Sequence, residues 1–160
     1  MRVVIIALGK MKDGPERELV DRYIKRAKPL GRSLGIKDFE IIEIAESSAK
    51  SSTTRKLEEA KKILGSIPDD AELIALDESG TYQTSKKFAS TMASNIENGT
   101  KCLTFVIGGP DGLDQSIRQR AKSILSFSPL TWPHQIVRAL LSEQLYRATT
   151  ILTGHPYHRS

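Results

Sequence analysis

Cysteine is nearly absent from this chain of 160 residues, in which Cys102 is the single one. A lone cysteine cannot form a disulfide within the chain, and it excludes zinc and iron–sulfur sites that are built from several thiolates. Long apolar runs are missing too. The stretch from Val3 to Leu8 falls far short of the roughly 20 residues of a membrane-spanning helix and is too short for the core of a signal peptide. We therefore expect a soluble protein of the reducing cytoplasm.

Nucleotide-binding and catalytic signatures are missing as well. The P-loop pattern G-x-x-x-x-G-K-[ST] does not occur, which excludes NTP hydrolysis of that type. The dinucleotide fingerprint G-x-G-x-x-G fits Gly109 and Gly112, but Ile107 stands in place of its first glycine, and this disfavours NAD. None of the three histidines has an assignable carboxylate partner. We expect neither a bound metal nor hydrolase chemistry.

Basic residues outnumber acidic ones, with 24 Lys and Arg against 19 Asp and Glu, and the formal net charge is +5. Residues 10–37 carry the whole excess, with nine basic and four acidic side chains. Such a stretch is typical either of a solvated, salt-bridged helix surface or of a surface for an anionic partner such as nucleic acid. Charge alone leaves both interpretations open.

Short apolar runs alternate with stretches whose apolar residues recur at helical spacing. The runs predict five strands, at residues 2–8, 39–45, 71–76, 102–107 and 123–127. The helical spacing predicts helices from about residue 15 to Pro29 and over residues 57–67, 84–98, 114–122 and 133–152. This alternation indicates a single α/β domain with a mostly parallel sheet and helices on both faces.

Turn and loop residues mark the joints between these elements. Pro29 should end the first helix, residues 47–54 should form a mobile loop, and residues 77–80 should form a turn. Cys102 stands among apolar strand residues, which favours a buried, inert thiol. The last helix is apolar around more of its circumference than one sheet face can cover. It should therefore make a homodimer contact as well as pack in the core.

Ligands of parallel sheets bind beyond the carboxyl ends of the strands. Turn-forming residues gather in three segments that leave strands at that edge, at residues 76–80, 107–112 and 127–133, and we place the functional site there. The chain then ends on an aromatic, an imidazole and a guanidinium, which suit stacking on bases and binding of phosphates. Together with the basic stretch, this tail of Tyr157, His158 and Arg159 favours RNA as the partner.

Five strings match a known family in their order and spacing: LDESG at residues 76–80, IGGPDG at 107–112, LTWPHQIVR at 130–138, EQLYRA at 143–148 and HPYHR at 155–159. From end to end the chain resembles the SPOUT-class methyltransferases that modify N3 of a pseudouridine in bacterial 23S ribosomal RNA. The resemblance implies a C-terminal trefoil knot, a homodimer, and S-adenosylmethionine as the methyl donor. It also implies ribosomal RNA, free or in the assembled ribosome, as the substrate.

The resemblance assigns cofactor binding to the strand-end segments, at Leu76, Gly108, Phe127, Ser128, Pro129, Leu130, Thr131 and Trp132. At Trp132 the chain departs from the smaller aliphatic residue of the family. The indole would either stack on the adenine or fill the interior of the knot.

The resemblance also implies that the tail is catalytic. Arg159 would stabilise the negative charge that develops on the base, and Tyr157 would stack on or orient the base. His158 and His134 remain alternative proton acceptors. Glu143 would either orient another catalytic residue or make a dimer contact, and we favour the dimer contact.

Two other functions remain open at this point. A non-enzymatic factor with the knot fold would bind ribosomal RNA through the basic helix and tail without methyl transfer, but it would not require three cofactor segments. A methyltransferase for transfer RNA is excluded only by the family resemblance.

Overall fold

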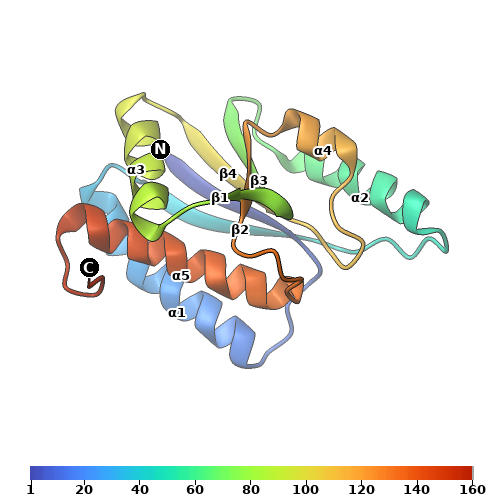
Figure 1. Cartoon of the computed structure of the whole chain (residues 1–160), viewed down its shortest axis with the longest axis horizontal. Helices are drawn as coiled ribbons and strands as arrows, with labels where there is room; N and C mark the ends of the chain where they lie inside the picture. The colour runs from blue at the N-terminus through green and yellow to red at the C-terminus, as the bar shows by residue number, and fades with distance from the viewer. Residues whose placement is uncertain (160) are drawn as a thin grey trace.

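The computed structural model describes residues 1–159 and contains one five-stranded sheet between two layers of helices (Figure 1). The strands are β1 (Arg2–Leu8), β2 (Asp38–Ile44), β3 (Ala71–Tyr82), β4 (Cys102–Ile107) and β5 (Ser123–Ser126). The helices are α1 (Pro15–Ser33), α2 (Ser52–Ser66), α3 (Ser85–Glu97), α4 (Gln115–Arg120) and α5 (His134–Thr153). Each predicted strand and helix is present. In this part of the chain no helix is long and apolar enough to cross a membrane.

All pairings between these strands are parallel, in the order β2-β1-β4-β3-β5. Helices α1, α3 and α5 pack on one face of the sheet, and α2 and α4 pack on the other (Figure 1). The predicted α/β architecture with helices on both faces is therefore confirmed. Because β4, β3 and β5 are neighbours, the segments that leave their carboxyl ends lie side by side. The trefoil knot stays a prediction.

Strand β1 shows why the strands read as continuous apolar runs. Val3 and Ile5 pack toward α1, α3 and α5, whereas Val4 and Ile6 pack toward α2 and α4. Successive side chains of a strand point to opposite faces, so a strand covered on both faces must be apolar at every position. Cys102 is 1% exposed in β4, and the predicted buried thiol is confirmed.

Helix α1 continues past Pro29 to Ser33, so the prediction that this proline ends the helix was wrong. A proline leaves the carbonyl four residues earlier without a helical partner, but Lys25 and Pro29 are both exposed and water can hydrate that carbonyl. Packing favours the continuation. A Cβ at Gly31 would lie 2.6 Å from Cε2 of Phe39, so the glycine lets the end of the helix close against β2.

Helix α2 begins inside the residues predicted as a mobile loop. The Ser51 hydroxyl accepts a hydrogen bond from the Thr54 backbone N–H at 3.4 Å and caps the helix, which starts at Ser52. The loop prediction was therefore wrong for residues 52–54, because a polar capping residue begins a helix before any apolar periodicity is visible.

Strand β3 runs through the residues predicted as a turn and ends at Tyr82. Its pairing with β5 shifts register between Leu76 and Thr81, and this irregularity absorbs the turn-forming residues. A Cβ at Gly80 would lie 2.7 Å from the carbonyl oxygen of Ile124, so only glycine allows this approach of the two backbones. The turn prediction was wrong, because residues 77–80 form an irregular stretch of a longer strand.

Candidate active site

A cavity of about 930 Å³ opens beyond the carboxyl ends of β4 and β5 and beside residues 76–78 of β3. All three predicted strand-end segments contribute to its wall, and the first residues of α5 complete it. Bare backbone lines the side next to β4. A Cβ at Gly108 would lie 3.1 Å from the carbonyl carbon of Gly112 and 3.1 Å from the Leu113 side chain, so a larger residue would crowd this segment.

Seven of the eight residues predicted to bind a cofactor line the cavity: Leu76, Gly108, Phe127, Ser128, Leu130, Thr131 and Trp132. Pro129 is exposed and lies outside the lining, although both of its chain neighbours belong to it. Leu130 is 64% exposed and Trp132 42%. Large apolar side chains that stand uncovered on a cavity wall are suited to cover a planar ligand. Cofactor binding by these residues stays a prediction.

Sequence reasoning missed the polar side of the cavity. Arg118 of α4 forms an ion pair with Asp77 at 2.9 Å and donates a hydrogen bond to the Ser79 hydroxyl at 2.9 Å. Burial raises the pKa of Asp77, but hydrogen bonds from Ser79 and Arg118 outweigh it and hold this pKa below its ordinary value. Glu78 accepts a hydrogen bond from Thr131 at 2.8 Å. Two carboxyl side chains next to the predicted residue Leu76 thus line the cavity and can accept hydrogen bonds from a ligand.

A residue of α2 holds the glycine-rich segment after β4. Arg55 donates through Nε and Nη2 to the two carboxylate oxygens of Asp111, at 2.8 and 3.1 Å. Its Nη1 donates to the carbonyls of Ala49 and Lys50, at 3.0 and 2.9 Å. The hydrogen bond from Arg55 lowers the pKa of Asp111. One guanidinium therefore ties the cavity wall to the loop before α2, a contact that no sequence motif indicates.

The start of α5 is anchored by buried charge. His134 lines the cavity, and its Nε2 lies 3.6 Å from the carboxylate of Glu46. One turn later, Arg138 is 2% exposed, forms an ion pair with Glu43 at 2.6 Å and donates to the carbonyl of Gly9 at 2.9 Å. Loss of Glu43 would leave the buried Arg138 charge without its partner, which is costly because that charge is shielded from water. This end of the cavity wall is therefore rigidly placed.

The tail folds back along α5 and is held by Glu143. One oxygen of this carboxylate accepts hydrogen bonds from the Tyr157 hydroxyl at 3.0 Å and from Nε and Nη2 of Arg147 at 2.9 and 2.5 Å. The Arg147 guanidinium lies 4.8 Å from the centre of the Tyr157 ring, and its Nη1 lies 3.2 Å from Nδ1 of His158. Glu143 thus orients the tail within its own chain, and a dimer contact by the same side chain stays a prediction.

Three tyrosines connect α1, α5 and the tail. The Tyr157 ring packs on Tyr146 with 4.6 Å between centroids, and Tyr146 stacks on Tyr23 of α1 at 6.1 Å. Burial, together with hydrogen bonds to Tyr23 and Glu143, raises the pKa of Tyr157 well above its ordinary value. Tyr157 therefore remains protonated and holds a fixed position.

One chain does not bring the tail and the cavity together. The cavity lies at the His134 end of α5 and the tail follows its other end (Figure 1). The helix has 20 residues and spans about 30 Å at 1.5 Å per residue. The described contacts of the tail along α5 reach back only to Glu143, and Tyr157, His158 and Arg159 are not among the residues that line the cavity.

The letters of residues 31–35, GRSLG, match the G-x-S-x-G pattern of a serine-hydrolase elbow. That elbow needs a sharp turn from a strand into a helix. Here Ser33 is the last residue of α1, and its hydroxyl donates to the carbonyl of Leu30 at 2.7 Å. The match is therefore one of letters only.

The family comparison covers nearly all of this chain. The family model described as a predicted SPOUT methyltransferase matches residues 1–158. The chain belongs to the SPOUT methyltransferase family. Full-length relatives include proteins named ribosomal RNA large subunit methyltransferase H. The one from Rhodopseudomonas palustris strain BisB18 is 52% identical over 160 residues, and the alignment covers all of both chains. Those from Bradyrhizobium diazoefficiens and Allorhizobium ampelinum are 51% and 48% identical, again over all of both chains.

The cavity of this SPOUT methyltransferase fits the cofactor that the resemblance implies. S-adenosylmethionine combines a planar adenine, a ribose and a cationic amino-acid end. Apolar side chains such as Leu130 and Trp132 suit the adenine, and backbone groups beside Gly108 can approach it closely. Asp77 and Glu78 suit the hydroxyl and ammonium groups, because carboxylates accept hydrogen bonds from both.

Proposed function

We propose that this chain transfers a methyl group from S-adenosylmethionine to large-subunit ribosomal RNA. One observation carries the proposal: the cavity at the strand ends is lined by seven residues that the sequence resemblance assigns to the cofactor. In full-length alignments, about half of the positions are also identical to those of proteins named as ribosomal RNA large subunit methyltransferases. A ribosomal substrate implies that the enzyme acts in the cytoplasm.

We further propose that the methyl acceptor is N3 of a pseudouridine, as the resemblance implies. S-adenosylmethionine supplies an electrophilic methyl group when bound. The imide N–H of a uracil-type ring must lose its proton, and negative charge develops on the ring. Arg159 carries a permanent charge on a planar fork and is exposed, so it can stabilise that ring. Tyr157 offers a protonated, fixed aromatic side chain against which the base can be positioned.

The contacts of the two histidines support His134 over His158 as the proton acceptor. Arg147 can only donate, so Nδ1 of His158 accepts from it and the neutral ring carries its proton on Nε2. His158 therefore has no free lone pair in this arrangement. His134 lines the cavity, and one nitrogen of its neutral ring carries a lone pair that can accept a proton there.

We propose that a homodimer completes the site. Because α5 separates the tail of each chain from its own cavity, Arg159 can act beside the cofactor only if the tail of a second copy supplies it. Leu140 of α5 is 37% exposed, and Leu130 and Trp132 are more exposed still. These uncovered apolar side chains on and next to α5 suit an interface between copies.

Calorimetry with S-adenosylmethionine, and with its demethylated product, tests the enzyme directly. We expect saturable binding of both without added metal or NAD, and quenching or enhancement of the fluorescence of Trp132, the single tryptophan. Transfer of a labelled methyl group should then be measured on free ribosomal RNA, assembled ribosomes and transfer RNA. Absence of cofactor binding combined with tight binding of ribosomal RNA would instead establish the non-enzymatic factor.

A further inference from the structure

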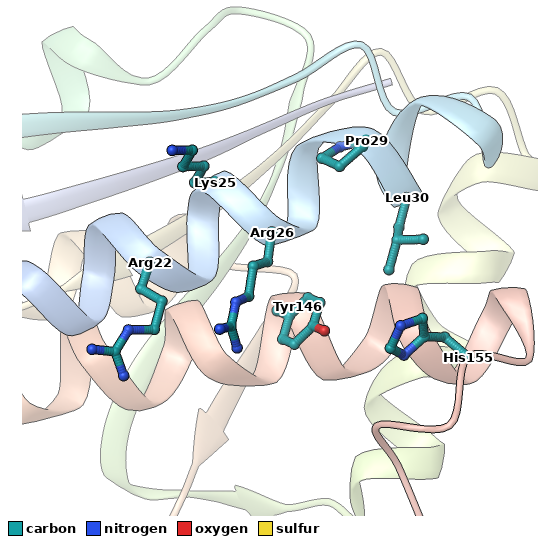
Figure 2. A pocket seen from close by; sticks show the side chains of 7 residues that line it. All are labelled: Arg22, Lys25, Arg26, Pro29, Leu30, Tyr146 and His155. Atoms are coloured by element: carbon teal, nitrogen blue, oxygen red, sulfur yellow. The ribbon is translucent and has the colours of Figure 1, made fainter.

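A second hollow, a groove of about 640 Å³, lies where α1 packs beside α5 (Figure 2). Arg22, Lys25 and Arg26 of α1 supply its cations, and the apolar surfaces of Leu30 and Tyr146 line it as well. Figure 2 shows Arg22, Arg26 and Leu30 projecting from α1 toward α5, with His155 near the end where the tail begins. No carboxylate lines the groove within residues 1–159.

The cations of this groove are not part of a salt-bridged helix surface. Arg17 forms ion pairs with Asp13 and Asp21, at 4.0 and 3.9 Å. Lys28 forms an ion pair with Asp38 at 3.0 Å. Arg22, Lys25 and Arg26 are exposed, and none of them has an ion-pair partner in the described part of the chain. Of the two interpretations of the basic stretch, the structure favours a surface for an anionic partner.

His155 adds a neutral hydrogen-bond donor. Its Nδ1 accepts the backbone N–H of Tyr157 at 3.2 Å, so the neutral ring must carry its proton on Nε2. The groove therefore offers three cations and a donor. A ligand that accepts hydrogen bonds and carries negative charge along its length satisfies all four, and a row of phosphates has this chemistry.

We propose that this groove binds the sugar-phosphate backbone of the RNA segment that adjoins the methylated nucleotide. Arg22 and Arg26 stand one helical turn apart, about 6 Å along α1, so their side chains follow one another along the groove. The groove leads directly to the tail, because Tyr146 of its lining packs on Tyr157 and His155 stands two residues before it. The phosphates would fix the register of the RNA while the tail engages the base. This inference rests on the proposed function and names the surface of the enzyme that binds the RNA substrate.

The test uses the full-length protein and 23S ribosomal RNA transcribed in vitro. Binding is measured across a series of KCl concentrations for the wild type and for the double variant Arg22→Gln/Arg26→Gln. We expect at least tenfold weaker binding and a salt slope reduced by about one to two, since each phosphate contact contributes about 0.7 to 0.9 to that slope. The matched control, Lys61→Gln/Lys62→Gln, removes the same charge from exposed positions on α2 and should bind like the wild type.

A third variant isolates the neutral donor. His155→Asn keeps an acceptor for the Tyr157 N–H, but its shorter amide places no donor at the position of Nε2, so RNA binding should weaken by about threefold to tenfold, as expected for one hydrogen bond. Cofactor binding, measured by calorimetry, should be unchanged in all these variants.

An unchanged salt slope and affinity in the double variant would overturn the proposal. So would a double variant that loses RNA binding and also sediments as a monomer where the wild type is a dimer, because the groove would then hold a second copy. Failure of the proposed function is seen separately, as absence of cofactor binding or methyl transfer in the wild type.

Discussion

At the scale of single residues, Glu143 has the most connected role outside the cavity. Its carboxylate accepts hydrogen bonds from Arg147 and Tyr157. Arg147 in turn contacts His158, so Glu143 also helps to position that ring. Arg159, next along the chain, is exposed and free to reach a substrate, whereas Tyr157 is held from three sides. The tail therefore combines one exposed cation with an aromatic side chain held by its neighbours, and these two parts predict different mutational effects.

Replacing the cation should affect methyl transfer alone. Arg159→Ala is expected to leave folding, dimerisation and cofactor affinity nearly unchanged and to reduce methylation by on the order of a hundredfold, the scale for removing one group that stabilises developing charge. Steady-state methylation and calorimetry on the same preparation check this. Near-normal turnover would show that the tail is not catalytic.

Replacing Glu143, which holds Tyr157, should also change the titration of the Tyr157 hydroxyl. Burial, Tyr23 and Glu143 together raise the pKa of Tyr157, so its contribution to stability is fully present below the unfolded pKa of about 10 and is lost as the pH rises toward the folded value. Tyrosinate absorbance should show one of the four tyrosines ionising later than the others.

In Glu143→Gln the pKa of Tyr157 should fall toward its ordinary value. Methylation should drop about tenfold, because loss of a supporting carboxylate lets the catalytic side chain shift from its position. Cofactor affinity should not change. A tyrosine titration identical to that of the wild type would contradict the orienting role of Glu143.

At the scale of elements, the cavity wall depends on a contact between α2 and the segment after β4. Arg55 binds Asp111 with both of its facing nitrogens and also holds the loop before α2. The loop before α2 and the residues from Gly108 to Asp111 lie outside the helices and strands, so the guanidinium helps to fix the position of the wall.

Arg55→Gln should therefore weaken S-adenosylmethionine binding by roughly fivefold, with a small change in melting temperature, because a solvent-accessible ion pair contributes little to global stability. Asp111→Asn should act similarly. The exchange Arg55→Asp with Asp111→Arg should restore part of the affinity that each single change removes. Calorimetric affinities equal to that of the wild type in both neutral variants would contradict this role.

At the scale of the whole molecule, the separation of tail and cavity by α5 is the basis of our proposal that two copies complete one site. We expect sedimentation at low micromolar concentration to show a dimer rather than the 17.7 kDa chain. Mixing an Arg159→Ala chain with a chain disabled in the cavity by Gly108→Val should give heterodimers with one intact composite site and recover part of the activity. A monomer in sedimentation, or no recovery on mixing, would contradict the composite site.

The sequence by itself determined the alternation of elements, the two-sided burial of the strands and the edge of the sheet where the cavity lies. These features depend on local apolar periodicity and on turn residues, which are readable one segment at a time. It also pointed to Leu76, Gly108 and the segment around Trp132, because the spacing of those strings matches a family.

Only the tertiary structure decided what long-range packing controls. Pro29 lies within α1 because Gly31 packs on Phe39, and residues 77–80 remain in β3 because β5 pairs beyond them. Arg55 meets Asp111, and Arg138 meets Glu43, across separations that no local pattern encodes. The tail lies away from its own cavity because α5 is a rigid rod between them. The separation depends on how α5 packs in the fold, so only the tertiary structure shows that the tail and the cavity of one chain lie apart.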